Sequence, residues 1–369
     1  MHIQALSLTN FRNYGSLNLT CDPIANLFVG INGQGKTNIL ESIYYLCVAR
    51  SCRDASDKEL VNLNEDFFKI NGTGISSAGR EVELDIRYTR YSGKKVYINQ
   101  QPQRSLSELY GLLAAVVMAP DDRQLVQGSP SFRRRFLDIA ISQSNTGYLA
   151  TLQDYRRVVR QRNEALRMLQ SQRGGTSDLV VWDTHLIALG VRIMKKRIEV
   201  IEQFKKEAQK LHSIISDKNE SLEIAYTPSF KYDSESQLEN PFQEAIERSE
   251  RVERARGVTM VGPHRDDLTL SMDGVPLQSF GSQGQHKTAA TALKLAEAQF
   301  LWTQLETPPL LLLDDIFAEL DADRTARLIE LLPTFGQVFI TAAKESDFGT
   351  YSNKFQRFRV HAGTVTPFG

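Results

Sequence analysis

The strongest structural signal in this sequence is the stretch Gly30-Ile-Asn-Gly-Gln-Gly-Lys-Thr37, which matches the pattern G-x-x-x-x-G-K-[ST] in full. The apolar residues 24–29 before it predict a strand, and the spacing of apolar residues over 36–48 predicts a helix. Glycines let the backbone wrap so that its N–H groups face phosphate oxygens, and the helix N-terminus adds a partial positive charge. A purely structural turn is the alternative, which both flanks disfavour. We therefore predict a phosphate-binding loop made of Gly30, Ile31, Asn32, Gly33, Gln34, Gly35, Lys36, Thr37 and Asn38.

Two side chains of this loop suit the chemistry of a nucleotide and its metal ion. Lys36 would contact the β- and γ-phosphates, and the Thr37 hydroxyl would ligate Mg²⁺. A second ligand group follows the apolar run 310–313, where Asp314 and Asp315 end a predicted buried strand. Asp314 is then the Mg²⁺ carboxylate, and Asp315 would polarise the attacking water as a general base. A pair of helix-capping acids is the alternative for these two residues taken alone.

A second glycine-bearing turn, Phe280-Gly-Ser-Gln-Gly-Gln285, stands immediately before a predicted helix over 286–302. Its Ser282 hydroxyl and its backbone N–H groups would face an anion, with the helix dipole behind them. As an isolated pattern S-x-G-Q is weak, and a helix N-cap is the alternative. Its position adds weight, because Ser282 lies 28 residues before the apolar run that ends in the acidic pair.

The 369 residues indicate two or three domains. The first 120 residues predict a hairpin and a meander of strands. Apolar stripes over 148–169 and 187–215, joined by a glycine-rich turn, predict a short antiparallel helical hairpin, which is compatible with the core of a helical domain. Strand, helix and strand signals then return and predict a parallel α/β sheet. We therefore predict an α/β head over 1–120 plus 257–369, interrupted by a helical arm over 121–256.

The composition is that of a folded protein, with 41% apolar and 24% charged residues. No apolar run approaches the roughly 18 residues of a membrane span, and the N-terminal residues do not resemble a signal peptide. The cysteines Cys21, Cys47 and Cys52 form no C-x-x-C pair, which argues against a zinc site or a disulfide framework. We expect a protein of a reduced, cytosolic compartment.

The zero net charge conceals an uneven distribution of charge along the chain. Residues 131–210 contain 16 Lys and Arg but 8 Asp and Glu, a local charge of +8, so the remainder sums to −8. A basic segment in an otherwise acidic protein indicates a localised surface for a polyanion. Solvated helix faces are the alternative, and charge alone does not distinguish the two.

The order of phosphate loop, S-x-G-Q, acidic strand and A-x-L-D resembles an ABC-type ATPase head. Transporter subunits place the first two motifs much closer together, whereas Ser282 lies 246 residues after Lys36. A large insertion resembles the SMC-like class of DNA-repair ATPases, and a short arm without a C-x-x-C hook resembles its RecF family. Five stretches are similar to the RecF pattern: Asn10–Tyr14, Gly33–Glu41, Gly128–Asp138, Gly262–Asp267 and Leu312–Asp321.

This resemblance implies ATP with Mg²⁺ and an ATP-dependent homodimer. The phosphate loop of one subunit would hold ATP while the S-x-G-Q loop of the other caps the γ-phosphate, and loss of that phosphate would open the dimer. Thr341 stands where transporter ATPases have a switch histidine and is a candidate γ-phosphate sensor. Asp315 stands where ABC ATPases generally have Glu, and its shorter reach predicts slow hydrolysis. The resemblance implies that DNA stimulates this hydrolysis. The residues assigned to the site in trans are Ser282, Gln283, Gly284 and Gln285.

The resemblance also implies single-stranded, gapped and double-stranded DNA as ligands, and RecO- and RecR-type partners in recombinase loading, replication restart and SOS induction. No base-reading motif occurs, so nonspecific phosphate contacts are expected. For each candidate a solvated face or an ion pair within the arm is the alternative, and residues 133–135 would otherwise serve the joint of head and arm. The candidates are Arg133, Arg134, Arg135, Arg156, Arg157, Arg160, Lys195, Lys196 and Arg197.

Two assignments and two function classes stay open. Arg12 would reach either the nucleotide or the signature helix, and residues 262–267 would brace the signature region as an ion-pair network. An ABC-type ATPase subunit that does not act on DNA predicts a shorter insertion. A small-molecule kinase or a GTPase would use the same phosphate loop but has no S-x-G-Q, and a GTPase needs an N-K-x-D that this sequence lacks.

Overall fold

The computed structural model describes residues 1–171, 177–216, 220–319, 322–345 and 355–368. The chain forms two compact units. The first unit contains residues 1–123, 210–219 and 287–369, and the second unit contains residues 124–209 and 220–286.

These units divide the chain differently from the predicted head and arm at two places. Residues 257–286, predicted in the head, belong to the second unit because β10 (Asp267–Met272) pairs along its whole length with β9 (Leu222–Thr227). Residues 210–219, predicted in the arm, belong to the first unit, where the Arg327 guanidinium donates to the Ile215 carbonyl at 3.3 Å. Pairing between distant segments therefore sets both boundaries.

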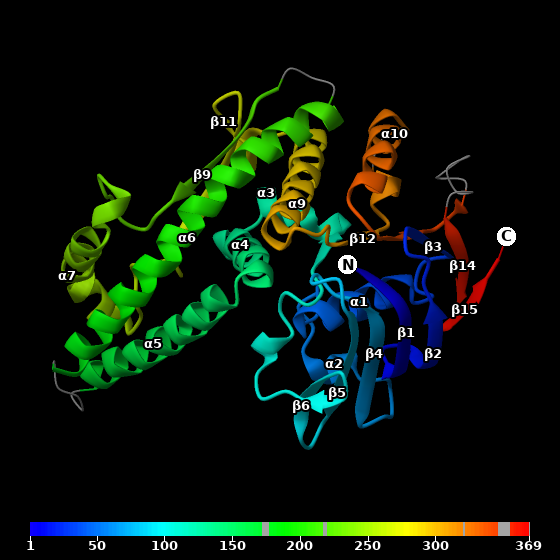
Figure 1. Ribbon diagram of the computed structural model, residues 1–369. Coiled ribbons are helices and arrows are strands. Elements are labelled where there is room, and N and C mark those ends of the chain that lie inside the picture. The colour runs from blue at the N-terminus through cyan, green and yellow to red at the C-terminus, as the bar shows by residue number, and fades with distance from the viewer. Residues whose placement is uncertain (172–176, 217–219, 320–321, 346–354, 369) are drawn as a thin grey trace. The chain divides into compact units, whose positions relative to one another are not determined.

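The N-terminal part of the first unit is an antiparallel sheet in the order β2-β1-β4-β5-β6-β7 (Figure 1). Alternating apolar side chains produce the predicted hairpin, in which Phe11 pairs with Tyr14, and the predicted meander follows it. Both predictions are confirmed. The strands are β1 (His2–Phe11), β2 (Tyr14–Thr20), β4 (Phe67–Ile75), β5 (Glu81–Thr89), β6 (Gly93–Ile98) and β7 (Gln101–Pro102).

A second sheet of the first unit has the order β15-β14-β3-β13-β12-β8. All of its neighbouring strands run parallel except β15, which lies antiparallel to β14 at the edge. The predicted strands at 24–29, 310–313 and 337–340 are its central members, which confirms the parallel α/β sheet. Their carboxyl ends meet at one edge. The strands are β3 (Ala25–Val29), β8 (Ala115–Met118), β12 (Leu310–Asp314), β13 (Val338–Ala342), β14 (Gln356–His361) and β15 (Thr364–Pro367).

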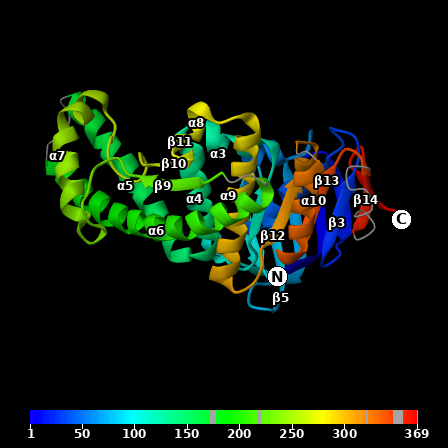
Figure 2. The ribbon, with the colours of Figure 1, turned by 90° about the horizontal axis from the view of Figure 1, so that it is seen from above.

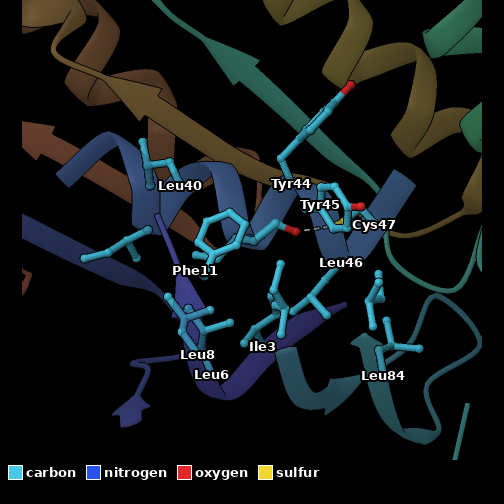
Figure 3. Packing of buried hydrophobic residues seen from close by; sticks show 14 of the residues in the cluster. Ile3, Leu6, Leu8, Phe11, Leu40, Tyr44, Tyr45, Leu46, Cys47 and Leu84 are labelled. Carbon is cyan, nitrogen blue, oxygen red and sulfur yellow. Dashed lines mark hydrogen bonds between the residues drawn. The ribbon is translucent and has the colours of Figure 1, made fainter. Parts of the chain in front are cut away.

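Helix α1 (Lys36–Val48) contacts both sheets and lies in a hydrophobic core of the first unit. Figure 3 shows Leu46 of this helix next to Ile3 of β1, and Leu40 belongs to the same cluster of buried residues. Because apolar residues occur on every face of the helix, it can be covered on both sides. The predicted helix over 36–48 is confirmed.

Three further helices have most or all of their residues in the first unit. A helix expected near 324–332 joins β12 to β13, and the helix expected over 286–302 begins three residues earlier than predicted. Both are confirmed as elements, with small changes at their ends. They are α2 (Asp57–Leu60), α9 (Gln283–Leu305) and α10 (Ala322–Leu331).

The second unit is mainly helical, and α5 and α6 form its antiparallel pair (Figures 1 and 2). Tyr148 near the start of α5 contacts Arg197 far along α6, whereas Arg162 later in α5 pairs with Asp183 near the start of α6. These contacts confirm the predicted helical hairpin. The elements are α3 (Gln124–Gln127), α4 (Pro130–Ser144), α5 (Thr146–Gln170), α6 (Ser177–Ser216), α7 (Glu239–Arg256) and α8 (Leu277–Phe280).

A small antiparallel sheet in the order β11-β10-β9 completes the second unit. A turn at Asp273-Gly274 joins β10 to β11 (Val275–Pro276), and both turn residues have positive φ, of 51° and 76°. This geometry is typical of a two-residue hairpin turn. Among the helices that the structure describes, none combines the length and the apolar character needed to cross a membrane.

Candidate nucleotide site

The predicted phosphate loop connects β3 to α1 and depends on glycine at two positions. A Cβ atom on Gly30 would lie 2.3 Å from the Val360 carbonyl oxygen of β14. Gly35 has φ of 111°, and a Cβ there would lie 2.6 Å from the Asn13 side chain and 2.9 Å from the Tyr14 hydroxyl. The loop therefore lies close to both the parallel sheet and the β1–β2 turn. A residue with a side chain at position 30 or 35 would prevent this close approach.

Polar side chains from the β1–β2 turn brace this loop. The Asn13 amide donates to the Gln34 carbonyl at 2.9 Å and accepts from the Asn38 amide at 2.8 Å. The Tyr14 hydroxyl donates to the Gly35 carbonyl at 3.0 Å. These contacts involve the Asn10–Tyr14 stretch that resembles the family pattern, and they give it a role in holding the loop.

The Lys36 side chain turns back onto the loop that precedes it. It is 5% exposed, and its ammonium donates to the carbonyls of Gly30 at 2.5 Å and Ile31 at 3.1 Å. Burial lowers the pKa of Lys36, while the negative charges of Asp315 and Asp314 act in the opposite direction. The loop thus surrounds a cation whose acceptors are two backbone oxygens and, at 3.4 Å, the Asn32 side-chain oxygen.

At the carboxyl edge of the parallel sheet, three elements bring oxygen atoms together. Asp314 at the end of β12 is paired in register with Thr341 of β13. The Asp314 Oδ1 atom accepts from the Thr37 hydroxyl at 2.8 Å and from the Thr341 hydroxyl at 2.7 Å. The Asp315 N–H donates to the Thr341 Oγ1 atom at 3.0 Å. The structure therefore brings together four of the predicted site residues: Thr37, Asp314, Asp315 and Thr341.

The donor atoms of this cluster fit Mg²⁺. Thr37 and Asp314 offer a hydroxyl and a carboxylate oxygen, which are hard ligands, and Mg²⁺ usually takes one or two carboxylates together with waters and substrate phosphates. The described residues contain no group of three or more His, Cys, Asp and Glu side chains that could enclose a metal. A metal held here would therefore depend on phosphate oxygens for much of its coordination.

Asp315 adopts a left-handed backbone conformation with φ of 51°. A non-glycine residue in this region costs about 1–3 kcal/mol and is found often where a side chain must be aimed. The residue follows a buried parallel strand directly, so the turn changes the direction of the chain at the sheet edge.

A buried carboxylate beside the loop pairs with two arginines. For Arg12 the sequence left open a contact with the nucleotide or with the signature helix, whereas sequence reasoning did not assign Arg53. Glu41 of α1 is fully buried and pairs with Arg12 at 2.8 Å and with Arg53 at 2.7 Å. These arginines and the Ser51 hydroxyl keep the pKa of Glu41 lowered although burial raises it. Arg53 also donates to the Asn38 side chain at 2.7 Å, which places it next to the phosphate loop. No sequence pattern indicates that Arg53 belongs to the site. Its contacts with Glu41 and Asn38 form only when the segment 49–56 folds back against α1.

The predicted signature loop lies in the second unit, at the start of α9. The Ser282 N–H donates to the Gln285 side chain at 2.8 Å, and the Gln285 N–H donates to the Ser282 hydroxyl at 3.2 Å. This reciprocal arrangement is a capping box. Ser282 and Gln283 are exposed, so the cap leaves both side chains at the surface of their unit.

Two of the predicted DNA-binding arginines are not surface residues, which corrects the expected basic surface. Arg133 is 3% exposed and forms a two-point ion pair with Asp267 at 2.7 and 2.9 Å. Arg197 is 2% exposed, pairs with Asp138 at 2.7 Å and donates to the Pro263 carbonyl at 2.6 Å. Both guanidinium groups form ion pairs with aspartates that are distant in sequence, so they do not contribute to an exposed basic surface.

The other candidates differ in exposure along α4, α5 and α6. Arg134, Arg135 and Lys196 are half-buried. The exposed candidates are Arg156, Arg157, Arg160 and Lys195.

The segment 262–267, expected to brace the signature region, makes contacts with residues 226–229 and with Thr259 of the second unit. The Asp266 carboxylate accepts from the Ser229 N–H at 2.7 Å and from the Tyr226 hydroxyl. The Arg265 guanidinium donates to the Thr259 carbonyl at 2.8 Å. The segment therefore fixes the backbone before β10 through hydrogen bonds and ion pairs.

Comparison with known proteins agrees with the fold and with the motifs. The sequence matches the model of the family described as RecF/RecN/SMC N terminal domain over residues 2–366. It is 39% identical to the DNA replication and repair protein RecF of Halalkalibacterium halodurans over 344 residues, which cover 92% of each chain. It is 38% identical to the protein of the same name from Staphylococcus carnosus, covering 99% of this chain and 100% of that one.

Solved structures of RecF and of an Smc head domain are similar to this fold. The fold matches the recombination mediator protein RecF with ATP in the RecFOR pathway, with a TM-score of 0.92 and 30% identity over 100% of this chain and 98% of that chain. An Smc head domain from Pyrococcus furiosus is similar in fold alone, with a TM-score of 0.56 and 16% identity. The chain therefore belongs to the RecF family of DNA replication and repair proteins and has the ABC-type ATPase head of the SMC-like class.

Proposed function

We propose that this protein is an ATP-dependent DNA-binding clamp of replication and recombinational repair. The observation that carries the proposal is the convergence of Thr37, Asp314 and Thr341 beside a phosphate loop, in a chain of the RecF family. A relative of known structure is described with ATP and as part of the RecFOR pathway, which supports ATP as the nucleotide and RecO- and RecR-type proteins as partners. The roles extend to recombinase loading and SOS induction on gapped, single-stranded and double-stranded DNA.

In this proposal the loop binds the phosphates of ATP through its backbone N–H groups, residues 30–38 forming the cradle. The Lys36 ammonium exchanges its loop carbonyls for β- and γ-phosphate oxygens, which are stronger acceptors for a cation. The Thr37 and Asp314 oxygens hold Mg²⁺, which when bound neutralises charge on the phosphates.

The hydrolytic step assigns separate roles to two neighbouring residues. Asp315, which follows the buried strand at the sheet edge in a left-handed turn, takes a proton from the attacking water. Thr341, which contacts both Asp314 and the Asp315 N–H, senses the γ-phosphate. An aspartate reaches less far than a glutamate would, so we expect slow hydrolysis that serves as a switch.

The signature residues Ser282, Gln283, Gly284 and Gln285 act in trans in this proposal. Their loop is capped at the N-terminus of a 23-residue helix, where backbone N–H groups and the helix dipole favour an anion. The γ-phosphate of one subunit would meet this loop of its partner and hold the dimer together. Hydrolysis would remove that shared charge and release the dimer.

Light scattering with and without ATP tests the dimer. We expect the wild-type chain to double in mass with ATP, Asp315→Asn to dimerise without turning over ATP, and Lys36→Met to remain monomeric. Lys58→Met, which changes an exposed lysine, is the control for the loss of a positive charge. Wild-type chains that stay monomeric with both ATP and DNA would contradict the clamp.

Binding of gapped duplex with ATP, with ADP and without nucleotide tests the link to DNA. We expect the tightest binding with ATP, because the dimer offers two sets of phosphate contacts. Equal DNA affinity with ATP, with ADP and without nucleotide would contradict the proposed dependence of DNA binding on ATP. A chain that hydrolyses ATP but binds no DNA would instead favour an ABC-type ATPase subunit that does not act on DNA.

A further inference from the structure

The second unit contains a cavity of about 150 Å³ that α4, α5, α6 and the segment before β10 line together. Four arginines contribute to its wall, although they come from three different helices: Arg134, Arg135, Arg156 and Arg197. Asp138 is the single carboxylate among the lining residues. One water molecule needs roughly 10–15 Å³ by this kind of measure, so the cavity has room for a polyatomic anion with several waters.

The charge around the cavity is positive even when the acidic residues behind its wall are included. The wider cluster consists of five guanidinium groups, from Arg133 and the four lining arginines, and three carboxylates, from Asp138, Asp266 and Asp267. The excess is two positive charges. His264, which also lines the cavity, adds none at neutral pH because burial lowers its pKa to about 4.

The lining guanidinium groups are held in position from behind. Arg197 uses three of its N–H donors on Tyr148, Pro263 and Asp138. Arg156 donates to the second oxygen of Asp138 at 3.1 Å. A guanidinium has five N–H donors in a fixed plane, so groups anchored on one side are oriented toward a ligand on the other at little entropic cost.

Arg134 lies close to a second cation of the cavity. It is half-buried, and its guanidinium donates to the Asp266 carbonyl at 2.7 Å. Burial and the positive charge of Arg197 lower the pKa of Arg134, while the carboxylates of Asp267, Asp266 and Asp138 act in the opposite direction without cancelling the shift. An anion between these groups would offset both effects, since it supplies charge and hydrogen-bond acceptors where two cations approach each other.

We propose that this cavity binds one phosphate group, with Arg134, Arg135 and Arg156 as the charged contacts and Arg197 as a positioning residue. The tetrahedral oxygens of phosphate suit several guanidinium groups that arrive from different helices. The inference deepens the proposed function, because the phosphate can be that of DNA, yet the binding of phosphate itself does not depend on DNA binding.

Equilibrium dialysis with labelled inorganic phosphate at constant ionic strength tests the site directly. The full chain carries Lys36→Met throughout, so that the phosphate loop contributes little. We expect saturable binding of one phosphate per chain, a loss of roughly tenfold or more in affinity with Arg156→Gln, and no binding with Ser131→Glu, which adds a negative charge to the exposed rim. Arg157→Gln is the matched control, because Arg157 is exposed, adjacent to Arg156 and outside the cavity.

These measurements distinguish failure of the phosphate site from failure of the proposed function. No saturable phosphate binding, or equal losses from Arg156→Gln and Arg157→Gln in chains of unchanged melting temperature, would overturn the proposal. Failure of the proposed function would appear differently, as wild-type chains that bind no DNA while phosphate binding persists.

Competition then identifies the source of the phosphate. Duplexes with 5′-hydroxyl and 5′-phosphate ends that displace labelled phosphate equally indicate a backbone phosphate. Displacement by the 5′-phosphorylated duplex alone indicates a terminal phosphate. Displacement by neither indicates a free phosphate compound, and each of these results keeps the site while naming its ligand.

Discussion

The phosphate loop of the first unit and the arginine-rich helices of the second unit carry their charges in different ways. In the proposed phosphate loop, the groups that would face an anion are backbone N–H groups, and the path of the loop depends on glycines such as Gly30 and Gly35. In the helices, the charged groups are long side chains whose partners come from distant parts of the sequence. Arg133, for example, pairs with Asp267, which lies 134 residues further along.

This difference explains why one region could be interpreted from its motif and the other could not. A local backbone pattern specifies its own geometry, because the residues that shape it are adjacent in sequence. A count of lysines and arginines specifies neither exposure nor pairing. The local charge of +8 over 131–210 therefore overstated the exposed basic surface, since Arg133, Arg162 and Arg197 are buried and Arg133 pairs with Asp267 outside that segment.

The largest effect is expected from Asp138→Ala in the second unit. This change leaves the buried Arg197 without its carboxylate and removes the acceptor of the Tyr148 hydroxyl. We expect the free energy of unfolding to fall by about 3–5 kcal/mol, measured by urea denaturation. Asp154→Ala removes an exposed pair with Arg157 and should cost less than about 1 kcal/mol. Equal costs would mean that the burial of these charges does not matter.

Gly35→Ala tests whether the phosphate loop of the first unit requires glycine at this position. The new Cβ would overlap the Asn13 and Tyr14 side chains and would hold a strained φ of 111°. We expect nucleotide affinity to weaken by about 3 kcal/mol, roughly a hundredfold, in calorimetric titrations with ATP. Gly15→Ala is the control, because a Cβ there meets no atom within 4 Å. Retained affinity would show that the loop adapts instead of depending on its glycines.

A pH dependence should distinguish the buried network of the second unit. Burial, with help from the charges of Arg265, Arg134 and Arg162, lowers the pKa of His264 from 6.5 to about 4. The folded chain then binds fewer protons than the unfolded chain between these values, so stability falls as the pH drops through this window. We expect a loss of about 2 kcal/mol between pH 7 and pH 5 from this group.

Urea denaturation of wild type and His264→Gln at both pH values measures this term. The glutamine variant should lose less stability on acidification. In wild type the ring Nε2 donates to the Thr259 carbonyl and Nδ1 accepts from the Tyr155 hydroxyl, as a neutral imidazole can. The same pH dependence in both proteins would assign the effect to other groups.

The smallest effect is expected from the exposed arginines of α5. Arg157→Gln together with Arg160→Gln should leave stability within about 0.5 kcal/mol. If both side chains contact duplex phosphates, the slope of log affinity against log salt should decrease by about 0.9 per contact. Arg248→Gln, on the exposed face of α7, is the control outside the basic segment. An unchanged slope would show that Arg157 and Arg160 of α5 do not contact DNA phosphates.

Much of the fold could be predicted because its signals are local. The β1–β2 hairpin, the meander, α1 and the parallel strands all follow from periodicity and turn residues, and the structure confirms them. The pairing of β9 with β10 was not predicted, since nothing in the residues around 222–227 identifies a partner more than 40 positions away. That pairing is also why residues 257–286 belong to the second unit.

The candidate site shows the same division. The phosphate-loop motif indicated Lys36 and Thr37, and the acidic pair after an apolar strand indicated Asp314, whereas the contact of Thr341 with Asp314 depends on the register between β12 and β13. Arg53 carried no signal, because its partner Glu41 lies on a different element.

The chain alone thus specified a glycine-shaped phosphate loop, the helices and strands around it and membership of a recognisable family, because each of these rests on residues that are neighbours along the backbone. Which arginines are buried, which oxygens meet at the sheet edge and where a cavity lined by four guanidinium groups lies are properties of the folded molecule. They depend on contacts between segments that only folding brings within a few ångströms, and charge and hydrogen-bond energies vary steeply over such distances.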